Sequence, residues 1–282
     1  MSGTLFVVAT PIGNLEDLTP RARQTLAQAD LIAAEDTRHT GRLLSHFGIK
    51  TPQFALHDHN EEHVVEVLLA DLVAGRSIAL VSDAGTPLIS DPGYRLVRAA
   101  HQHKIAVSPV PGVSAATAAL SAAGLATNRY CFEGFLPAKK NARRARIDEL
   151  RHEHRTIVLY ESVHRVADCL ADLVSAFGAE HAAFVGRELT KLHEQCVHST
   201  LGSLAAMIEN GSIPTKGEFV IVVAGSDARR TSSLDVDRLL VELAGALPGN
   251  EAAKLVARAT GEKRNALYKR LLELRGDAAD ES

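Results

Sequence analysis

The sequence has few cysteines, and those it has lie far apart. Cys131, Cys169 and Cys196 are odd in number, and no two of them form a C-x-x-C pair. A disulfide framework needs paired cysteines and a thiolate zinc site needs closely spaced ones, so we expect neither. The three thiols are expected to be small buried side chains in a reducing compartment.

Long apolar runs are also missing from the chain. The sequence has no window of about twenty uninterrupted apolar residues, which is the length that a membrane-spanning helix needs. The first apolar run, at residues 5–9, has only the length of a strand, follows no basic segment and ends at a Thr-Pro turn. It therefore does not resemble a secretory signal, and we expect a cytoplasmic protein without a membrane partner.

Several well-known catalytic motifs are absent. The sequence has no G-x-x-x-x-G-K-[ST] phosphate loop, no G-x-G-x-x-G after its first strand, and no G-x-S-x-G elbow for a nucleophilic serine. These absences argue against phosphate-loop and dinucleotide-binding enzymes and against serine hydrolases.

Charge is unevenly distributed along a chain whose formal net charge is −3. Residues 139–155 hold seven Lys or Arg against three acids, and residues 251–275 hold the same numbers. Two basic segments on an acidic protein predict a polyanionic partner such as nucleic acid. The alternative is that helices at the surface simply carry solvated charge.

The order of apolar runs predicts two α/β domains and a helical appendage. In residues 1–125, short apolar runs alternate with helical patterns, which indicates crossover connections and a mainly parallel sheet. Residues 126–226 follow a different order and predict a second α/β domain with a mixed sheet. Residues 227–282 begin as a polar linker and continue as three helical patterns, and Gly261 between the last two fits a helix-turn-helix-like appendage.

Three loops follow predicted strands of the first domain, where open α/β sheets bind their ligands. They are TPIGN at residues 10–14, SDAGTPLISDPG at residues 82–93 and PGVSA at residues 111–115. Small residues in such loops let the backbone approach a ligand closely. Asp83 and Asp91 add carboxylates that can hold an ammonium group or a ribose hydroxyl.

The segment HDHNEEH at residues 57–63 has some features of a metal site. His59 and His63 are spaced as zinc ligands on a helix, but the motif H-E-x-x-H is absent and the segment fits a solvated helix start equally well. We expect a polar loop that helps to orient an acceptor, and no bound metal.

A resemblance to a known family rests on eight segments in register. They are ATPIGNLEDLTPRA, AEDTRHTGRLL, VSDAGTPLISDPG, PGVSAATAAL, FEGFLP, YESVHR, GRELTKLHE and KGEFVIVV. Together they resemble the tetrapyrrole methylase superfamily, and within it the branch that methylates small-subunit ribosomal RNA. TPIGN stands where the superfamily often has G-x-G-P-G, as in this RNA-modifying branch, and this departure makes a tetrapyrrole acceptor less expected.

This resemblance implies a fold, a reaction and a set of contacts. The two α/β domains are expected to hold S-adenosylmethionine between them, usually in a homodimer, and to methylate the ribose 2′-hydroxyl of a cytidine in 16S ribosomal RNA. The residues that the resemblance places against the methyl donor are Pro11, Ser82, Asp83, Ala84, Thr86, Ser114, Ala115, Tyr160, Glu161, Glu188 and Leu189.

Transfer to a hydroxyl is helped by a base, because a protonated ribose hydroxyl is a poor nucleophile. Glu35 is the first candidate, followed by Asp36 and by His59 or Glu61. The alternative for Glu35 and Asp36 is a helix N-terminus, where acidic side chains suit the helix dipole. The residues predicted to contact ribosomal RNA, free or in the 30S particle, are Arg38, Lys139, Lys140, Arg143, Arg144, Lys263, Arg264, Lys269 and Arg270.

Three other functions are kept as alternatives. A methylase of a small tetrapyrrole acceptor would not need residues 232–282, and a non-catalytic RNA-binding regulator would not bind the donor. A metal-dependent hydrolase built on residues 57–63 would lose its activity on chelation. The sequence alone identifies neither the base, nor the target nucleotide, nor the oligomeric state.

Overall fold

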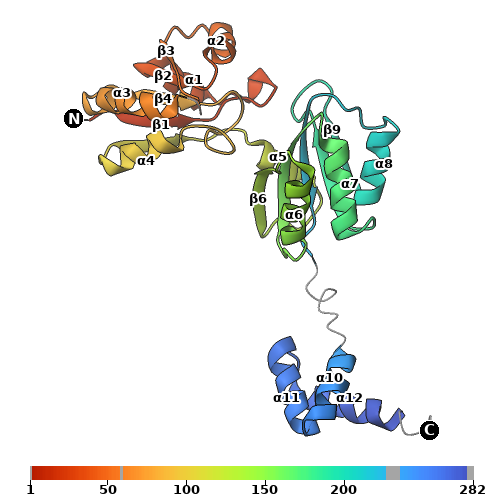
Figure 1. Ribbon diagram of the computed structural model, residues 1–282. Coiled ribbons are helices and arrows are strands. Elements are labelled where there is room, and N and C mark those ends of the chain that lie inside the picture. Colours follow the sequence, from red (N-terminus) through yellow and green to blue (C-terminus); the bar gives the residue numbers. More distant parts are fainter. Residues whose placement is uncertain (1, 58–59, 227–235, 278–282) are drawn as a thin grey trace. The chain divides into compact units, whose positions relative to one another are not determined.

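The computed structural model describes residues 2–57, 60–226 and 236–277. The chain divides into two compact units, residues 1–151 with 155–224, and residues 152–154 with 225–282. The first unit contains two five-stranded sheets, and the described part of the second contains three helices (Figure 1). The polar linker predicted at the start of the appendage falls largely on residues 227–235, which lie outside the described residues.

The first sheet is entirely parallel. Its strands are β1 (Thr4–Val8), β2 (Leu31–Ala34), β3 (Gln53–Ala55), β4 (Ile78–Val81) and β5 (Ala106–Val110), in the order β3-β2-β4-β1-β5. Every residue of β2 and β4 is buried, as the uninterrupted apolar runs of a sheet covered on both faces predict. The three-residue strand β3 was not predicted, because it is too short to show periodicity.

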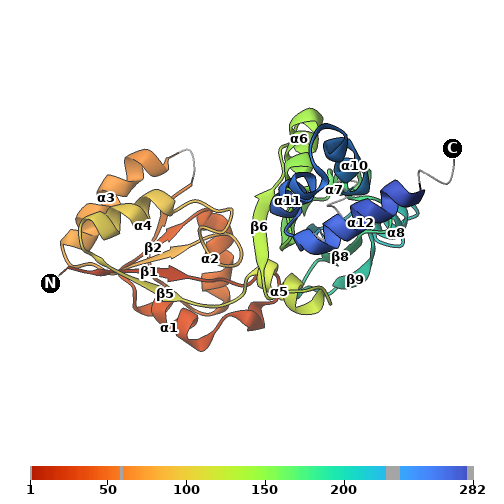
Figure 2. The ribbon, with the colours of Figure 1, turned by 90° about the horizontal axis from the view of Figure 1, so that it is seen from below.

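Helices cover both faces of this sheet, as Figure 2 shows. The helices α1 (Pro20–Gln28) and α2 (Thr37–His46) pack on one face through residues such as Leu26 and Leu43. The helices α3 (Glu61–Val73) and α4 (Tyr94–Gln102) pack on the other through Leu68 and Leu96. A short 3-10 turn, η1 (Leu15–Asp17), precedes α1. The loops that follow β1, β2 and β4 therefore meet at one edge of the sheet.

The second sheet is mixed. Its strands are β6 (Tyr130–Phe135), β7 (Thr156–Ser162), β8 (Ala182–Arg187), β9 (Gln195–Thr200) and β10 (Glu218–Val223), in the order β6-β7-β10-β8-β9. Only β6 and β7 run parallel; the other neighbours are antiparallel. The expected combination of a parallel sheet and a mixed sheet is confirmed.

Helices also cover both faces of the second sheet. The helices α6 (Lys140–Leu150), α7 (Val166–Phe177) and α8 (Leu201–Glu209) cover one face, through a core that includes Leu170 and Leu204. The helix α5 (Ala115–Ala122) packs on the other face, against Val158 and Val220, and Ile12 joins this cluster from the loop after β1. The domain boundary predicted at residue 125 stays a prediction; α5 precedes it in the chain and nevertheless packs on the second sheet.

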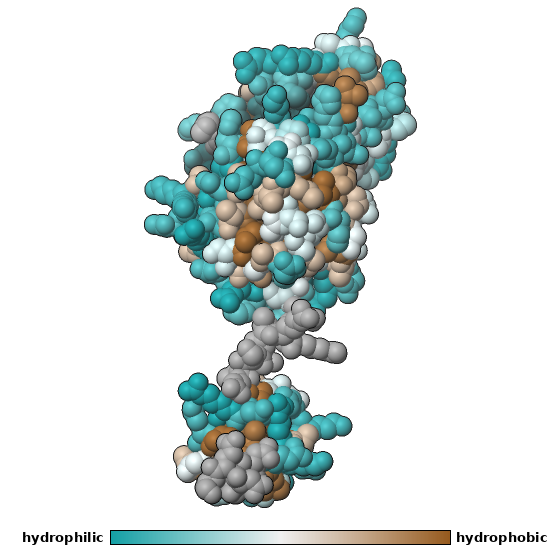
Figure 3. All heavy atoms as spheres, turned by 90° about the vertical axis from the view of Figure 1, so that its right-hand side faces the viewer, coloured by the Kyte–Doolittle hydropathy of each residue, from teal (hydrophilic) through white to brown (hydrophobic). Residues whose placement is uncertain are grey.

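The second unit is a small helical domain. It contains α10 (Val236–Ala246), α11 (Gly249–Thr260) and α12 (Arg264–Asp277), which share a core that includes Leu240, Val256 and Leu267. Gly261 ends α11 with a φ of 76°, a left-handed conformation that favours glycine and allows the tight turn into α12. Apolar side chains also reach its surface (Figure 3); those exposed are Val241, Leu247, Leu255, Tyr268 and Leu272.

Within the described residues, no helix combines the length and the apolar character needed to cross a membrane.

Candidate active site

Two cavities lie beside each other in the first unit. The first, which we call the Tyr160 cavity, has a volume of about 370 Å³ and is lined by the loop after β4, the start of α5, the end of β7 and the start of β10. The second, which we call the Arg42 cavity, has a volume of about 280 Å³ and is lined by the loops after β1 and β4, by α2, and by Lys191 and Glu218. Both cavities lie at the carboxyl edge of the parallel sheet, where the three predicted loops begin.

Four residues line both cavities, and we call this shared boundary the ridge: Ile12, Asp83, Ala84 and Glu218. The two residues that follow β2 hold Asp83 in place. The Asp83 carboxylate accepts a hydrogen bond from the Asp36 backbone N–H at 3.0 Å, and the Asp83 N–H donates to Glu35 Oε2 at 3.2 Å. The side chain of Asp83 is therefore fixed at the position where molecules in the two cavities would meet.

The loop after β4 has an unusual backbone. Leu88 and Ser90 adopt left-handed conformations, with φ of 72° and 71°, which side-chain-bearing residues rarely adopt. The loop is held in place by backbone pairing between Thr10 and Gly85 and by a hydrogen bond from the Thr86 hydroxyl to the Val113 carbonyl at 3.1 Å. Strained backbone that the surroundings hold in place is typical of ligand-binding loops.

The second α/β domain, which contains the second sheet, contributes aromatic and acidic side chains to one wall of the Tyr160 cavity. The Tyr160 hydroxyl accepts a hydrogen bond from the Ala116 N–H at 3.1 Å, and burial raises the pKa of Tyr160, so the phenol stays neutral. The rings of Phe132 and Phe135 pack edge-on against it, at 4.9 and 5.7 Å between centroids. The cavity wall is therefore flat and apolar beside Tyr160 and becomes acidic at Glu161.

Glu161 and Arg165 connect this wall to the loop after β6. Glu161 is 2% exposed, and its carboxylate accepts from the Ser162 N–H at 2.8 Å and lies 3.3 Å from Arg165 Nη2. Arg165 also donates to the carbonyls of Leu136 and Pro137, at 2.6 and 3.2 Å. One guanidinium thus fixes both a buried carboxylate of the cavity and the loop that leads to the basic start of α6.

The structure brings together most of the residues predicted to touch the donor. Those that line the Tyr160 cavity are Asp83, Ala84, Thr86, Ser114, Ala115, Tyr160 and Glu161. Pro11 and Ser82 line the Arg42 cavity instead.

Glu188 and Leu189 line neither cavity, in contrast to the direct contacts predicted for them. Leu189 is buried in the core beneath the second sheet. Glu188 accepts from the Glu218 N–H at 3.0 Å and from Lys191 Nζ at 2.9 Å, so it acts by holding two residues that line the cavities. Its carboxylate also fills the space beside Gly217, where a Cβ would come within 2.3 Å of it.

The predicted catalytic acids have separate positions. Glu35 is half-buried on the Tyr160 cavity. Asp36 caps α2: it accepts from the Arg38 N–H at 2.8 Å and pairs with the Arg38 guanidinium, and these hydrogen bonds hold its pKa well below its usual range. A carboxylate with so low a pKa is a poor base, so the alternative of a helix N-terminus is correct for Asp36.

The segment at residues 57–63 has a structural role where it is described. Glu61 is 8% exposed, and its carboxylate accepts from the N–H groups of Gly93 and Arg95 at the start of α4, at 3.2 and 2.9 Å. Glu61 is therefore a cap for α4 and not a base. His59 lies outside the described residues. No group of three or more His, Cys, Asp or Glu among the described residues has the geometry of a metal site.

The residues predicted to contact RNA fall into three groups. Lys139, Lys140, Lys263 and Arg264 are exposed. Four others are exposed but already engaged: Arg38 with Asp36, Arg144 with Asp172, Lys269 with Glu273, and Arg270 with Asp237. Arg143 is buried, with 2% exposure, and pairs with Asp172 at 2.8 Å, so its predicted contact with RNA is wrong. The number of Lys and Arg residues in the segment gave no indication of this buried ion pair in the second α/β domain.

Sequence reasoning missed several residues that line the cavities. His39 and Arg42 lie one turn apart on α2 and both face the Arg42 cavity, a relation that the i, i+3 spacing in AEDTRHTGRLL would have shown once α2 was placed. Phe135, Lys191 and Glu218 come from distant parts of the chain, and no local pattern points to them.

Comparisons with known proteins agree with this arrangement. The sequence profile of the tetrapyrrole (corrin/porphyrin) methylases matches residues 4–205, and that of the RsmI C-terminal HTH domain matches residues 230–275. The fold is thus that of a methylase with an appended helical domain. The chain belongs to the tetrapyrrole methylase family and, within it, groups with the ribosomal RNA small subunit methyltransferase I proteins.

These relatives match over nearly the whole chain. A ribosomal RNA small subunit methyltransferase I from Xylella fastidiosa (strain Temecula1) is 53% identical, over 94% of this chain and 98% of the relative. Another from Escherichia coli O157:H7 is 50% identical, over 97% and 96%. Uroporphyrin-III C-methyltransferase from Thermus thermophilus, solved with S-adenosylhomocysteine, has a TM-score of 0.53 at 17% identity over 79% of this chain and 97% of that chain, a likeness of fold.

Proposed function

We propose that this chain transfers a methyl group from S-adenosylmethionine to the ribose 2′-hydroxyl of a cytidine in 16S ribosomal RNA. The observation that carries the proposal is the ridge between the two cavities, where a donor in one and an acceptor in the other can meet at Asp83. The names of relatives about half identical over nearly full length support ribosomal RNA as the acceptor.

The Tyr160 cavity suits the methyl donor. S-adenosylmethionine carries an ammonium group, ribose hydroxyls and a flat base, and the cavity offers the carboxylates of Asp83 and Asp91, the Ser114 hydroxyl and the ring of Tyr160. Ala84 and Ala115 leave room for the backbone to approach a ligand. The solved relative that contains S-adenosylhomocysteine has the same fold, which is consistent with this use of the cavity.

When bound there, S-adenosylmethionine supplies an electrophilic methyl group on a sulfonium. The chain has to align the acceptor oxygen with this carbon, and well-oriented placement can supply about 7–11 kcal/mol of the barrier. Glu35, beside Asp83, would receive the hydroxyl proton as the oxygen–methyl bond forms and the methyl–sulfur bond breaks, with S-adenosylhomocysteine as the leaving group. Asp83 holds the geometry through its bonds to residues 35 and 36.

Exposed basic residues attract the negatively charged backbone of the acceptor RNA. Lys139 and Lys140 at the start of α6, and Lys263 and Arg264 before and at the start of α12, bind the RNA backbone. We expect the affinity for small-subunit RNA to fall with salt, with a log–log slope of about −0.7 per neutralised phosphate. Filter binding across a salt series measures this slope, and an affinity independent of salt would contradict it. The assembly proposed is a cytoplasmic homodimer.

Calorimetry and mass spectrometry together test the function. The purified chain should bind S-adenosylmethionine, and small-subunit RNA from cells that lack the protein should miss one methyl group on a cytidine ribose. A regulator without catalysis would bind no donor, and a tetrapyrrole methylase would leave the ribosomal RNA unchanged.

We also expect Arg165 to be needed for donor binding. Arg165→Ala leaves the buried Glu161 carboxylate without its guanidinium and frees the loop at Leu136, at a cost of about 1–3 kcal/mol, so the donor Kd should rise about 5- to 150-fold. Arg165→Lys keeps the charge and should recover part of the affinity. Calorimetric titration measures both, and an unchanged Kd in the alanine variant would show that the Arg165–Glu161 ion pair plays no part in donor binding.

A further inference from the structure

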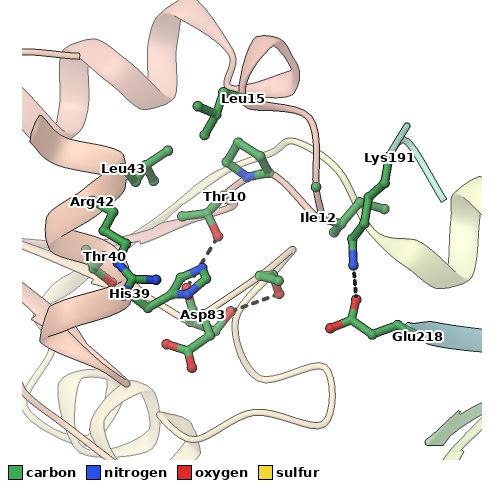
Figure 4. Close-up of a pocket in the computed structure, with 14 residues that line it drawn as sticks. Thr10, Ile12, Leu15, His39, Thr40, Arg42, Leu43, Asp83, Lys191 and Glu218 are labelled. Carbon is green, nitrogen blue, oxygen red and sulfur yellow. Dashed lines mark hydrogen bonds and ion pairs between the residues drawn. The ribbon is translucent and has the colours of Figure 1, made fainter. Parts of the chain in front are cut away.

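The lining of the Arg42 cavity contains basic side chains, and that of the Tyr160 cavity does not. Figure 4 shows His39 and Arg42 side by side on α2, both directed into the cavity, with Lys191 and Glu218 at its far side. His39 and Arg42 are three residues apart, so one face of the helix presents both side chains. Thr10, whose hydroxyl donates to the Ser82 carbonyl at 3.3 Å, lies between these two walls.

The charged groups of this cavity differ in whether they have partners. Lys191 binds Glu188 and Glu218, each at 2.9 Å; burial opposes its charge, but these carboxylates outweigh burial and raise the pKa of Lys191. Asp83 is fixed by the backbone at residue 36. The Arg42 guanidinium, by contrast, makes no hydrogen bond or ion pair with any residue that the structure describes. It is therefore available to an external anion.

We infer that the Arg42 cavity is the acceptor subsite, which takes one unstacked ribonucleotide and binds its phosphate through Arg42. This inference rests on the proposed function. A guanidinium presents several N–H donors in a plane and pairs with two phosphate oxygens at once. His39 lies beside it as a second donor, and the ridge at Asp83 is left for the ribose.

The size of the cavity supports a single nucleotide. At about 280 Å³ it lies just below the range of small-molecule sites, roughly 300–1,000 Å³. Enzymes that do chemistry on a base commonly take the nucleotide out of its stack and into a pocket, and the proposed subsite would receive its nucleotide in the same way. A nucleotide held in this way places its sugar between the phosphate at Arg42 and the donor beyond the ridge.

Arg38 provides a matched comparison on the same helix. It is 87% exposed, does not line the cavity, and is neutralised by Asp36 at 2.8 Å. Arg38→Gln and Arg42→Gln therefore remove the same charge from the same helix, but only Arg42→Gln removes a donor from the cavity. Any difference between the two variants reports the subsite and not the general field of the protein.

The test measures methylation of small ribosomal subunits that lack the modification. For Arg42→Gln we expect KM for the subunits to rise at least about tenfold, as the loss of a charge-assisted contact predicts, with the Kd for S-adenosylmethionine unchanged by calorimetry. For Arg38→Gln we expect a much smaller rise in KM, because Asp36 already neutralises its charge, and an unchanged Kd for S-adenosylmethionine. In the wild type, cytidine 5′-monophosphate should inhibit more strongly than cytidine, and Arg42→Gln should abolish this difference.

Three outcomes would overturn the subsite: equal rises in KM for both variants, a rise only for Arg38→Gln, or equal inhibition by the nucleotide and the nucleoside in the wild type. Failure of the proposed function is distinguishable, because the wild type would then bind no donor or leave the subunits unmethylated before any variant is compared.

Discussion

Replacement of Glu35 by glutamine is expected to lower kcat about 10²–10⁴-fold while the Kd for S-adenosylmethionine stays nearly unchanged. Glu35 directly follows β2, and its Oε2 accepts from the Asp83 N–H at 3.2 Å. The side-chain carbonyl of glutamine can accept the same hydrogen bond, so the ridge keeps its shape. What glutamine cannot do is receive the proton of the acceptor hydroxyl.

Asp36→Asn is the matched control for this prediction. Asparagine caps a helix as well as aspartate does, so α2 should keep its start. The hydrogen bonds from Arg38 hold the pKa of Asp36 well below its usual range, which makes Asp36 a poor base. Loss of its charge should therefore change kcat by no more than a few-fold. Single-turnover methyl transfer under saturating donor separates the chemical step from binding. Equal losses in both variants, or no loss in Glu35→Gln, would show that Glu35 is not the base.

The sequence predicted the fold because its strands are simple apolar runs. The fully buried β2 and β4 could be recognised without knowledge of their neighbours, and caps such as Thr19 before Pro20 marked where helices begin. The loops after β1 and β4 could be assigned to one site because parallel strands end at the same edge of a sheet. The match to a family then added the second-domain residue Tyr160, which no local pattern indicates.

Other parts of the site depend on contacts between distant segments. Lys191 and Glu218 reach the Arg42 cavity through an ion pair between positions 27 residues apart. Glu61 meets the start of α4 only in the folded chain. Arg143 is different, because its position was readable: Arg143, Ile147 and Leu150 fall on the buried stripe of α6 at i, i+4 and i+7. Counting charges along the segment overlooked this periodicity.

Removal of Asp172 is expected to be among the most destabilising substitutions in the second domain. Asp172 on α7 has a side chain that is 3% exposed, and it accepts from Arg143 Nε at 2.8 Å and from Arg144 Nε at 2.7 Å, which ties α7 to α6. Asp172→Ala leaves the Arg143 guanidinium, itself 3% exposed, buried with only the exposed carboxylate of Asp168, at 3.7 Å. Breaking a buried pair in this way costs about 3–5 kcal/mol. Chemical denaturation should show this loss in the free energy of unfolding.

The double variant Arg143→Met with Asp172→Leu tests whether the loss comes from the stranded charge. Apolar replacement of a whole buried pair is often neutral, so this variant should recover most of the stability that Asp172→Ala loses.

Burial opposes the charge of Asp172, but the hydrogen bonds from Arg144 and Arg143 outweigh it and lower its pKa. The pair's contribution is therefore present above the ordinary carboxyl value of 3.8 and is lost as pH falls through the lowered pKa. The double variant should accordingly lose less stability in acid than the wild type, and its affinity for RNA should match the wild type because Arg143 faces the protein interior. If the double variant is as unstable as Asp172→Ala, the loss of stability comes from packing and not from the unpaired charge. If the double variant loses affinity for RNA, Arg143 contributes to RNA binding.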